Sequence, residues 1–334
     1  MHRSESAPLD CKALPKIELH AHLTGSISRQ CLHEIWLTKK AAGETDLQDP
    51  LIEMPPGKFD YDLKTFFPLF SSYIYNLVND AASLRYATLS VLRDFADDGV
   101  VYLELRTTPR AMPAAGLTEA EYVQTILDSI ADYERTQQRK PGLRTKLILS
   151  VDRRHSPSQA AGVVALARQF VGRGVVGLDL CGDPAAPLDP ALPGLLREAP
   201  CSAGDAELDA LLACRPDRLG HVVCVGDRVR REIRARPGLG LELCLSCNVH
   251  AGMVCGGFEA HHFREWWNVD GTVVVLCTDD VGVFGSPLSN EYALVIKHFK
   301  LSRSEVCALV RKGIDVIFGG EEEKKRLREI LWSE

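Results

Sequence analysis

The chain has 334 residues, of which 46% are hydrophobic and 25% charged, and a formal net charge of −6 at pH 7. This composition is ordinary for a globular protein with a sizeable core, and the net charge gives no general attraction to nucleic acid or to an anionic membrane surface. No apolar run approaches the roughly 18 residues of a membrane span. Residues 1–13 lack the apolar stretch of a secretion signal and are expected to be disordered, so the sequence predicts a cytoplasmic protein.

Short apolar runs alternate with longer amphipathic segments along the chain. Such alternation indicates parallel βα units, and near-continuous apolar strands indicate a sheet covered on both faces. The expected strands are residues 16–23, 100–106, 145–151, 175–180, 217–223, 239–244 and 272–277. The expected helices between them include residues 81–97, 119–136, 158–171 and 229–236.

Seven such strands predict a single α/β domain over residues 1–334, a (β/α)8 TIM-type barrel, with a doubly wound sheet as the alternative. The barrel is favoured because nearly every strand ends in a candidate functional group, and barrel active sites gather at the carboxyl ends of the strands. Those ends read HAH, LRTTPR, SVDRR, DLCGD, LGH, LCLSCN and LCTDD. Residues 39–61, rich in Gly, Pro and acidic side chains, are expected to cross the mouth of the barrel.

Two motifs are better explained by structure than by chemistry. Residues 172–177, GRGVVG, fit the dinucleotide-binding pattern GxGxxG, but a helical pattern precedes them and a strand follows, which reverses the required order. These glycines predict a helix stop and a tight turn. Cys244 and Cys247 form a CxxC motif with no second pair at zinc-finger spacing, so we expect both to be reduced packing residues.

A histidine pair and an aspartate pair suggest a metal site. Residues two apart in a strand share a face, so His20 and His22 should point the same way. A catalytic zinc site uses three protein ligands and leaves one position for water. Asp279, with Asp280 beside it, and His221 stand at the ends of two later strands. A lone strand-end histidine is usually a hydrogen-bonded or packed group, but this combination predicts a metal site. The other histidines are expected on the surface or in packing: His2, His33, His155, His250, His261, His262 and His298.

The segments HAHLTGS, LELRTTPR, SVDRR, GLDLCGDP, DRLGH, LELCLSCN and CTDDVGVF together resemble the adenosine/AMP deaminase family. More closely, they are similar to its adenosine deaminase-like branch, the N6-methyl-AMP deaminases, over residues 14–330. The resemblance implies a hydrolase of the C–N bonds of cyclic amidines, with one Zn2+ per chain. Its substrate would be a small purine nucleotide, as in the conversion of N6-methyl-AMP and water to IMP and methylamine. We also expect a monomer with no nucleic-acid or membrane partner.

Carried over motif by motif, the resemblance assigns roles to individual residues. His20, His22 and Asp279 would be the zinc ligands. The catalytic residues would be His221, which would orient the attacking hydroxide, and Asp280, which would contact that water or the purine ring.

Substrate contacts are implied by the same comparison. They are His22, Thr24, Thr107, Thr108, Arg110, Asp152, Gly182 and Asp280. Thr24 stands where relatives often have Asn. Arg110, beside two threonines, is suited to clamp a phosphate because a guanidinium matches phosphate geometry.

The sequence departs from the family between Gly182 and His221. There the family carries a fifth strand that ends in HxxE, whose His is the third imidazole on zinc and whose Glu donates a proton to N1 of the purine. The interval here contains no histidine and no strand-like run, and residues 195–199 and 206–213 have helical patterns. The barrel is therefore expected to lack its fifth strand. Glu198 and Glu207 are the nearest carboxylates, and neither stands in the motif.

The missing motif leaves alternatives open. A catalytically impaired chain that still binds purine nucleotides would keep TTPR, CGDP and the aspartate pair; zinc content and a deaminase assay distinguish it from an enzyme. Another amidohydrolase-like enzyme could use the same histidine pair, and activity on a cyclic amide but not on purines would identify it. An altered transcript or gene model of an active enzyme and a genuine inactive paralogue would both explain the gap.

Overall fold

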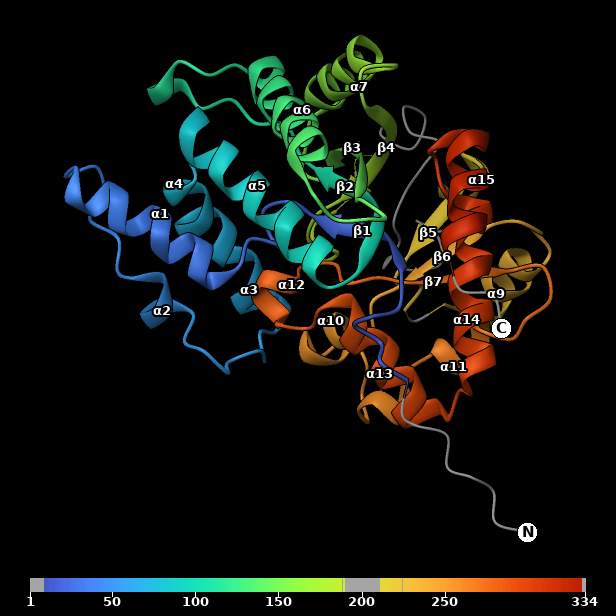
Figure 1. Cartoon of the computed structure of the whole chain (residues 1–334). Coiled ribbons are helices and arrows are strands. Elements are labelled where there is room, and N and C mark those ends of the chain that lie inside the picture. Colours follow the sequence, from blue (N-terminus) through green and yellow to red (C-terminus); the bar gives the residue numbers. More distant parts are fainter. Residues whose placement is uncertain (1–8, 188, 190–210, 224, 332–334) are drawn as a thin grey trace.

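The computed structural model describes residues 9–187, 189, 211–223 and 225–331. The strands in this part of the chain are parallel and form two sheets, each in chain order (Figure 1). The first sheet contains β1 (Lys16–His22), β2 (Val100–Thr107), β3 (Arg144–Asp152) and β4 (Val175–Cys181). The second sheet contains β5 (Arg218–Gly220), β6 (Gly240–Leu243) and β7 (Val273–Leu276). All seven lie where the sequence predicts strands.

The end of β1 joins the two sheets. Ala21 pairs in parallel with Asp279, just beyond β7. The His22 N–H donates to the Asp279 carbonyl at 3.0 Å, and the Asp279 N–H donates to the His20 carbonyl at 2.8 Å. Joining the first and last strands edge to edge is what closes a barrel, so this pairing excludes the doubly wound alternative. The fold is a TIM-type barrel.

Helices cover the outer face of the strands (Figure 1). Beside the first sheet lie α5 (Ala81–Asp97), α6 (Glu119–Thr136) and α7 (Pro157–Phe170). Beside the second sheet lie α9 (Asp227–Arg234) and α14 (Arg303–Lys312). Helix α15 (Gly320–Ile330) follows α14, and its Arg326 donates to the Val101 carbonyl of β2. Asp80, Thr118 and Ser156 cap the helices α5, α6 and α7 by accepting a hydrogen bond from the third helical backbone N–H, which fixes where each helix starts.

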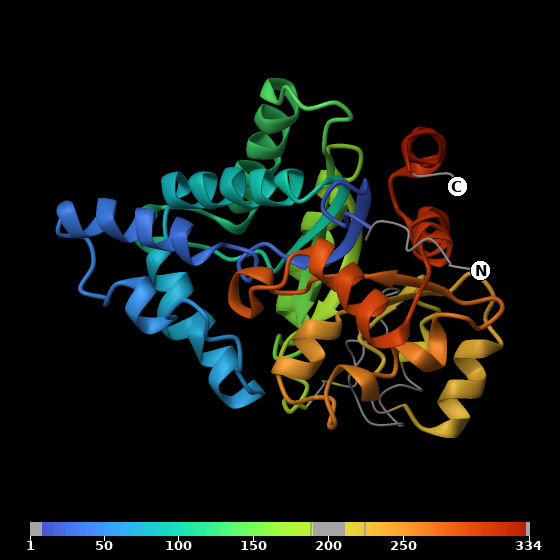
Figure 2. The same cartoon turned by 60° about the horizontal axis from the view of Figure 1, so that its bottom comes forward.

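Two further groups of helices lie near the carboxyl ends of the strands. The first group extends to one side of the barrel in Figure 2 and comprises α1 (Arg29–Ala41), α2 (Pro50–Glu53), α3 (Leu63–Leu69) and α4 (Tyr75–Leu77). The second group follows β6 and β7 and comprises α10 (Leu245–His250), α11 (Phe263–Trp266), α12 (Val281–Phe284) and α13 (Leu288–Phe299). Among the described residues, no helix combines the length and the apolar character needed to cross a bilayer.

The predicted turn at residues 172–177 is confirmed. Helix α7 ends at Phe170 and β4 begins at Val175. Between them, Gly172 and Gly174 have φ angles of 77° and 122°, a region that glycine occupies without a Cβ penalty. These glycines therefore form a helix stop and not a dinucleotide site.

The barrel has a seam between β4 and β5. Within the described residues, no strand pairs with the edge of β4 opposite β3 or with the edge of β5 opposite β6. Residues 176–178 of β4 are partly exposed, whereas β2 is buried along its whole length. The predicted loss of the fifth strand falls in this seam, but residues 190–210, with Glu198, Glu207 and the helical pattern at 195–199, lie outside the described residues. Residues 211–213, at the end of the second helical pattern, are helical.

The amino-terminal segment differs in part from its prediction. Residues 9–13 form a turn in which the Asp10 carboxylate accepts hydrogen bonds from the backbone of Lys12 and Ala13, and Cys11 is buried. Disorder predicted for residues 1–13 therefore does not extend to this turn, because the buried side chain ties it to the core. Residues 1–8 lie outside the described residues.

Candidate active site

Glu18 fixes the backbone on both sides of the predicted metal site. Its carboxylate accepts hydrogen bonds from the backbone N–H of His20 at 2.8 Å and from that of Thr278 at 2.9 Å. Burial raises the pKa of Glu18 to about 7. Because Thr278 directly precedes Asp279, one buried side chain holds the histidine pair and the aspartate pair in register.

His20, His22 and Asp279 converge at the end of β1. Nε2 of each histidine lies 3.4 Å from Oδ1 of Asp279. Zinc bonds to nitrogen and oxygen of about 2.0–2.2 Å place neighbouring atoms of a tetrahedral shell about 3.3 Å apart, which matches these spacings. The backbone of Asp279 is left-handed, with a φ of 61°. Such a conformation is uncommon for a residue with a Cβ and persists where the surroundings hold a functional side chain in place.

The donor set fits a divalent cation. Nε2 of His20 is buried and makes no hydrogen bond within the described residues. Burial and Arg106 lower the pKa of His20, but Asp279 and Glu242 outweigh both and raise that pKa to about 9. A cation at Nε2 would displace this proton. Two imidazoles and a carboxylate are a suitable ligand set for a catalytic zinc site.

Glu242, on β6, orients His20. Its Oε2 accepts a hydrogen bond from Nδ1 of His20 at 2.6 Å, so Nε2 is left for a ligand. The same carboxylate forms ion pairs with Arg106 at 2.9 Å and Arg218 at 2.7 Å. Burial would raise the pKa of Glu242, but the two guanidinium groups outweigh burial and hold that pKa well below its ordinary value. Histidine ligands of metals commonly have such a carboxylate partner.

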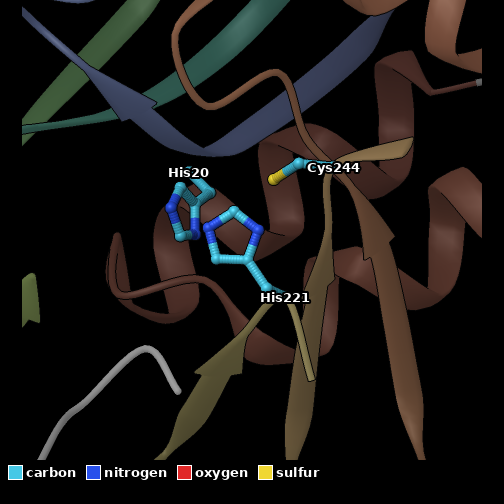
Figure 3. A group of neighbouring side chains, drawn as sticks. All are labelled: His20, His221 and Cys244. Carbon is cyan, nitrogen blue, oxygen red and sulfur yellow. The ribbon is translucent and has the colours of Figure 1, made fainter. Parts of the chain in front are cut away.

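His221 follows β5 and lies on the other side of Asp279. Its Nε2 is 3.6 Å from Oδ2 of Asp279, and its ring centroid is 4.9 Å from that of His20 (Figure 3). Burial lowers the pKa of His221 to about 4. Its backbone is also left-handed, with a φ of 59°. A neutral imidazole is therefore held beside the predicted metal ligands.

Two thiols complete the surroundings of these rings. Figure 3 shows the Cys244 side chain directed toward His20 and His221. The Cys247 thiol donates a hydrogen bond to Oδ2 of Asp279 at 2.8 Å. Burial raises the pKa of both thiols, so both are neutral groups and not thiolates. The CxxC motif, predicted to serve only packing, also orients the Asp279 carboxylate through Cys247.

Asp280 presents a neutral carboxylic acid. Burial and the adjacent Asp279 raise its pKa well above the ordinary value. Its Oδ1 is buried, and the described residues provide no hydrogen-bond partner for it. A Cβ at Gly25 would lie 1.4 Å from this oxygen, so the glycine of the HLTG segment is required for the close approach.

A single cavity collects every residue that the sequence predicts for the site. These are His20, His22, Thr24, Thr107, Thr108, Arg110, Asp152, Gly182, His221, Asp279 and Asp280. Aromatic side chains form part of its wall, among them Phe66, Phe67, Phe70 and Phe284. This wall comes from residues near α3 and α12, and not from residues 39–61 that were expected over the mouth.

Arg110 is held by aromatic rings at the cavity wall. Its guanidinium carbon lies 4.6 Å from the ring centroid of Tyr75 and 5.8 Å from that of Tyr122. One of its amino groups donates to the Val78 carbonyl, while its Nε is buried and unbonded within the described residues. Arg154, not predicted for the site, lines the same cavity and is held by the Asp152 carboxylate.

Several other residues that the sequence analysis did not assign to the site stand in segments that it had marked. Glu242 belongs to the segment LELCLSCN, as do Cys247 and Asn248, and Arg154 belongs to SVDRR. Their place in these segments suggested a role in the site, but a single sequence does not show which of the side chains point into the cavity. His261, predicted to be a surface or packing residue, is buried and linked to His221 through Asn248.

A family model described as adenosine deaminase matches residues 15–192 and 203–333. This chain belongs to the adenosine deaminase family. It is by membership a hydrolytic deaminase, and its barrel fold agrees with that assignment. The match passes over residues 193–202, inside the interval where the HxxE motif is missing.

Curated relatives cover nearly the whole chain. The human N6-methyl-AMP deaminase is 34% identical over 338 residues, which cover 95% of this chain and 92% of that protein. The Xenopus laevis N6-methyl-AMP deaminase-L is 35% identical over 334 residues, 95% of this chain and 92% of that protein.

Solved structures show the same fold. A crystal structure of an Arabidopsis ADAL protein complexed with GMP has a TM-score of 0.87 and 32% identity, and the match covers 96% of this chain and 97% of that one. A Burkholderia amidohydrolase with bound Zn has a TM-score of 0.79 at 19% identity, covering 98% of this chain and 93% of that one, a likeness of fold alone.

Proposed function

We propose that the cavity binds one zinc ion and a 6-substituted purine nucleotide and is arranged for hydrolytic deamination. The proposed reaction converts N6-methyl-AMP and water to IMP and methylamine. The observation that carries the proposal is the 3.4 Å spacing of His20 and His22 from one oxygen of Asp279, in a cavity that Arg110 also lines. The names of the relatives and the GMP complex of one of them support the substrate class.

The zinc ion is held by His20, His22 and Asp279 in this proposal. When bound, zinc lowers the pKa of a water ligand to about 7 and so supplies a nucleophile at neutral pH. Glu242 keeps the proton of His20 on Nδ1, and the Cys247 thiol keeps one carboxylate oxygen of Asp279 occupied. These two contacts restrict both ligands to one orientation.

The remaining side chains act on the substrate. His221, beside Oδ2 of Asp279, orients the attacking oxygen. Asp280, a neutral acid, donates a hydrogen bond to a ring nitrogen of the purine, since its buried Oδ1 has no other partner among the described residues. The aromatic wall that includes Phe66 and Phe70 packs against the base, and Arg110 binds the phosphate.

A second candidate function is nucleotide binding with impaired turnover. The observation that favours it is the stretch of residues 183–220, which contains no histidine and therefore no HxxE motif. In this case zinc loses an imidazole and the purine ring loses its positioned proton donor, while Arg110 and the aspartate pair still bind the nucleotide. We further expect the chain to be cytoplasmic and monomeric.

The test is to purify the full chain, measure its zinc content, titrate it with IMP, and assay methylamine release from N6-methyl-AMP. Zinc, IMP binding and turnover together support the deaminase. Zinc and IMP binding without turnover support the impaired form. A folded chain that binds neither zinc nor IMP contradicts both. His22→Gln serves as the matched variant that should lose zinc.

A further inference from the structure

A chain of hydrogen bonds runs from a backbone amide to the ring of His221. The Phe263 N–H donates to Nδ1 of His261 at 3.0 Å. Nε2 of His261 lies 3.1 Å from Oδ1 of Asn248, and Nδ2 of Asn248 lies 2.8 Å from Nδ1 of His221. Asn248 is fully buried and His261 is 1% exposed, so water does not compete with these contacts.

The backbone amide determines which atom donates and which accepts in each of these hydrogen bonds. A peptide N–H only donates, so Nδ1 of His261 must accept. Burial lowers the pKa of His261 far below neutrality, so the ring carries a single proton, and that proton is on Nε2. Nε2 therefore donates to Oδ1 of Asn248, which turns the amide NH2 of Asn248 toward Nδ1 of His221. The sulfur of Met253, a weak acceptor 4.0 Å from the same nitrogen, is consistent with this orientation.

We propose that Asn248 and His261 are positioning residues that keep Nδ1 of His221 unprotonated, so that the ring carries its proton on Nε2. Nδ1 of His221 accepts the Asn248 hydrogen bond and cannot carry a proton at the same time. The N–H of His221 then lies on the side of Oδ2 of Asp279, 3.6 Å away.

This arrangement decides between two roles for His221. With its proton on Nε2, the ring donates a hydrogen bond to an oxygen beside Asp279 and so orients it. The same nitrogen has no lone pair with which to take a proton from water, so His221 does not act as a general base from this state. This consequence rests on the proposed deaminase function, whereas the position of the proton does not.

The backbone of His221 is held as firmly as its ring. Its N–H donates to the Glu242 carbonyl at 2.7 Å, and its carbonyl accepts from Nε2 of His262 at 2.5 Å. The rings of His261 and His262 stack with centroids 4.1 Å apart. The imidazole therefore has little freedom to turn away from Asn248 and accept a proton on the other nitrogen.

The proton position is measured by 15N NMR of the full chain labelled at histidine, with the His221 signals identified from their loss in His221→Gln. We expect Nδ1 of His221 to have the chemical shift of an unprotonated ring nitrogen and Nε2 that of a protonated one. A protonated Nδ1, in the other tautomer or in the imidazolium, overturns the proposal. This readout needs no turnover, so it is separable from failure of the deaminase function.

Two variants test the hydrogen-bond chain from His261 through Asn248 to His221. Asn248→Asp places an acceptor-only carboxylate at Nδ1 and should transfer the proton of His221 to that nitrogen. His261→Leu removes the hydrogen bond that orients the Asn248 amide, so His221 should show a mixture of its two tautomers. His262→Gln is the matched control, because it alters the neighbouring ring but touches neither ring nitrogen of His221, and it should retain the wild-type tautomer. Near-ultraviolet circular dichroism shows whether Asn248→Asp and His261→Leu fold. If either variant folds and His221 keeps the wild-type tautomer, the proposal is overturned. If neither folds, the 15N spectrum of the wild-type chain decides.

Discussion

Glu242 accepts a 2.6 Å hydrogen bond from Nδ1 of His20, and the two residues, on β6 and β1, are 222 positions apart in the sequence. The contact leaves Nε2 of His20 facing Asp279. Glu242 is itself anchored by Arg106 and Arg218, so the buried charges inside the barrel determine how the first histidine of the site is presented.

Replacing Glu242 by Gln should weaken zinc binding about 10–100-fold, the usual effect of losing the partner of a histidine ligand. The amide no longer enforces the Nδ1–H tautomer of His20, and it removes the charge that strengthens the ligand. Zinc affinity is measured by competition with a chromophoric chelator.

Glu104→Gln is the matched control for Glu242→Gln. Glu104 is equally buried and pairs with Arg218 at 2.6 Å, but it does not touch His20. Glu104→Gln removes a carboxylate partner from one buried guanidinium, that of Arg218, and Glu242→Gln removes one from both Arg106 and Arg218. Each change destabilises the fold by about a few kcal/mol. Only Glu242→Gln should change zinc affinity; equal losses in both would mean that general destabilisation, and not orientation of His20, explains the effect.

The barrel was predictable because its signals are local. Each strand is a short apolar run bounded by turn residues, and the helices α5 and α6 match their predicted ranges to the residue because Asp80 and Thr118 cap them. The seam between β4 and β5 was predictable only as a missing pattern. The burial of Cys11 was not predictable, because it depends on a contact with the core that no local pattern records.

The site was predictable as a set of strand ends and not as a network. The carboxyl ends of parallel strands meet at one rim, which is why His20, His22 and Asp279 could be brought together from sequence. Which side chains support them depends on pairs far apart in the chain, such as Glu242 with His20. Their roles as zinc ligands remain predictions, as do the roles of the substrate contacts.

Acid should destabilise the fold in part through His261. Burial lowers the pKa of this histidine far below its value of about 6.5 in an unfolded chain. Below pH 6.5 the unfolded chain therefore binds a proton that the folded chain does not, and stability falls with pH by up to about 1.4 kcal/mol per pH unit from this residue. His261→Gln should reduce the slope of unfolding free energy against pH, measured by urea denaturation from about pH 7.5 to 5.5.

A raised pKa of His261 in the folded chain would have the opposite effect on stability. A histidine with a raised folded pKa would stabilise the fold at low pH and lose that stabilisation as the pH rises. If His261→Gln steepens the fall in stability with acid, or leaves the slope unchanged, the His261 ring is protonated in the folded chain. The orientation of the Asn248 amide toward His221 is then no longer determined by His261.

Arg110 should distinguish a nucleotide from a nucleoside. Arg110→Ala removes a guanidinium that lines the cavity, and a charge-assisted contact to phosphate contributes about 1.5–3 kcal/mol, or roughly ten- to a hundredfold in affinity. We expect this loss for IMP and little change for inosine, both measured by isothermal titration calorimetry.

Arg173→Ala is the control for Arg110→Ala. Arg173 also stacks on an aromatic ring, Phe170, at 4.7 Å, but it does not line the cavity. The Arg173→Ala variant should bind IMP and inosine with wild-type affinity. Equal weakening of IMP and inosine binding in Arg110→Ala would assign Arg110 to packing against Tyr75 and Tyr122. The phosphate would then be left to another cavity residue such as Arg154.

The 334-residue chain should deaminate N6-methyl-AMP at least about a thousandfold more slowly than a relative that has the fifth strand. The interval from Gly182 to His221 supplies no third imidazole, and a positioned general acid alone typically contributes about 10²–10⁴-fold. His221 and Asp280 already have other roles in the proposed site. The assay compares steady-state turnover of this chain, with added zinc, with that of a variant carrying an HxxE-bearing strand inserted after Ala199. Rates that agree within tenfold would show that a residue now in the chain serves as the proton donor.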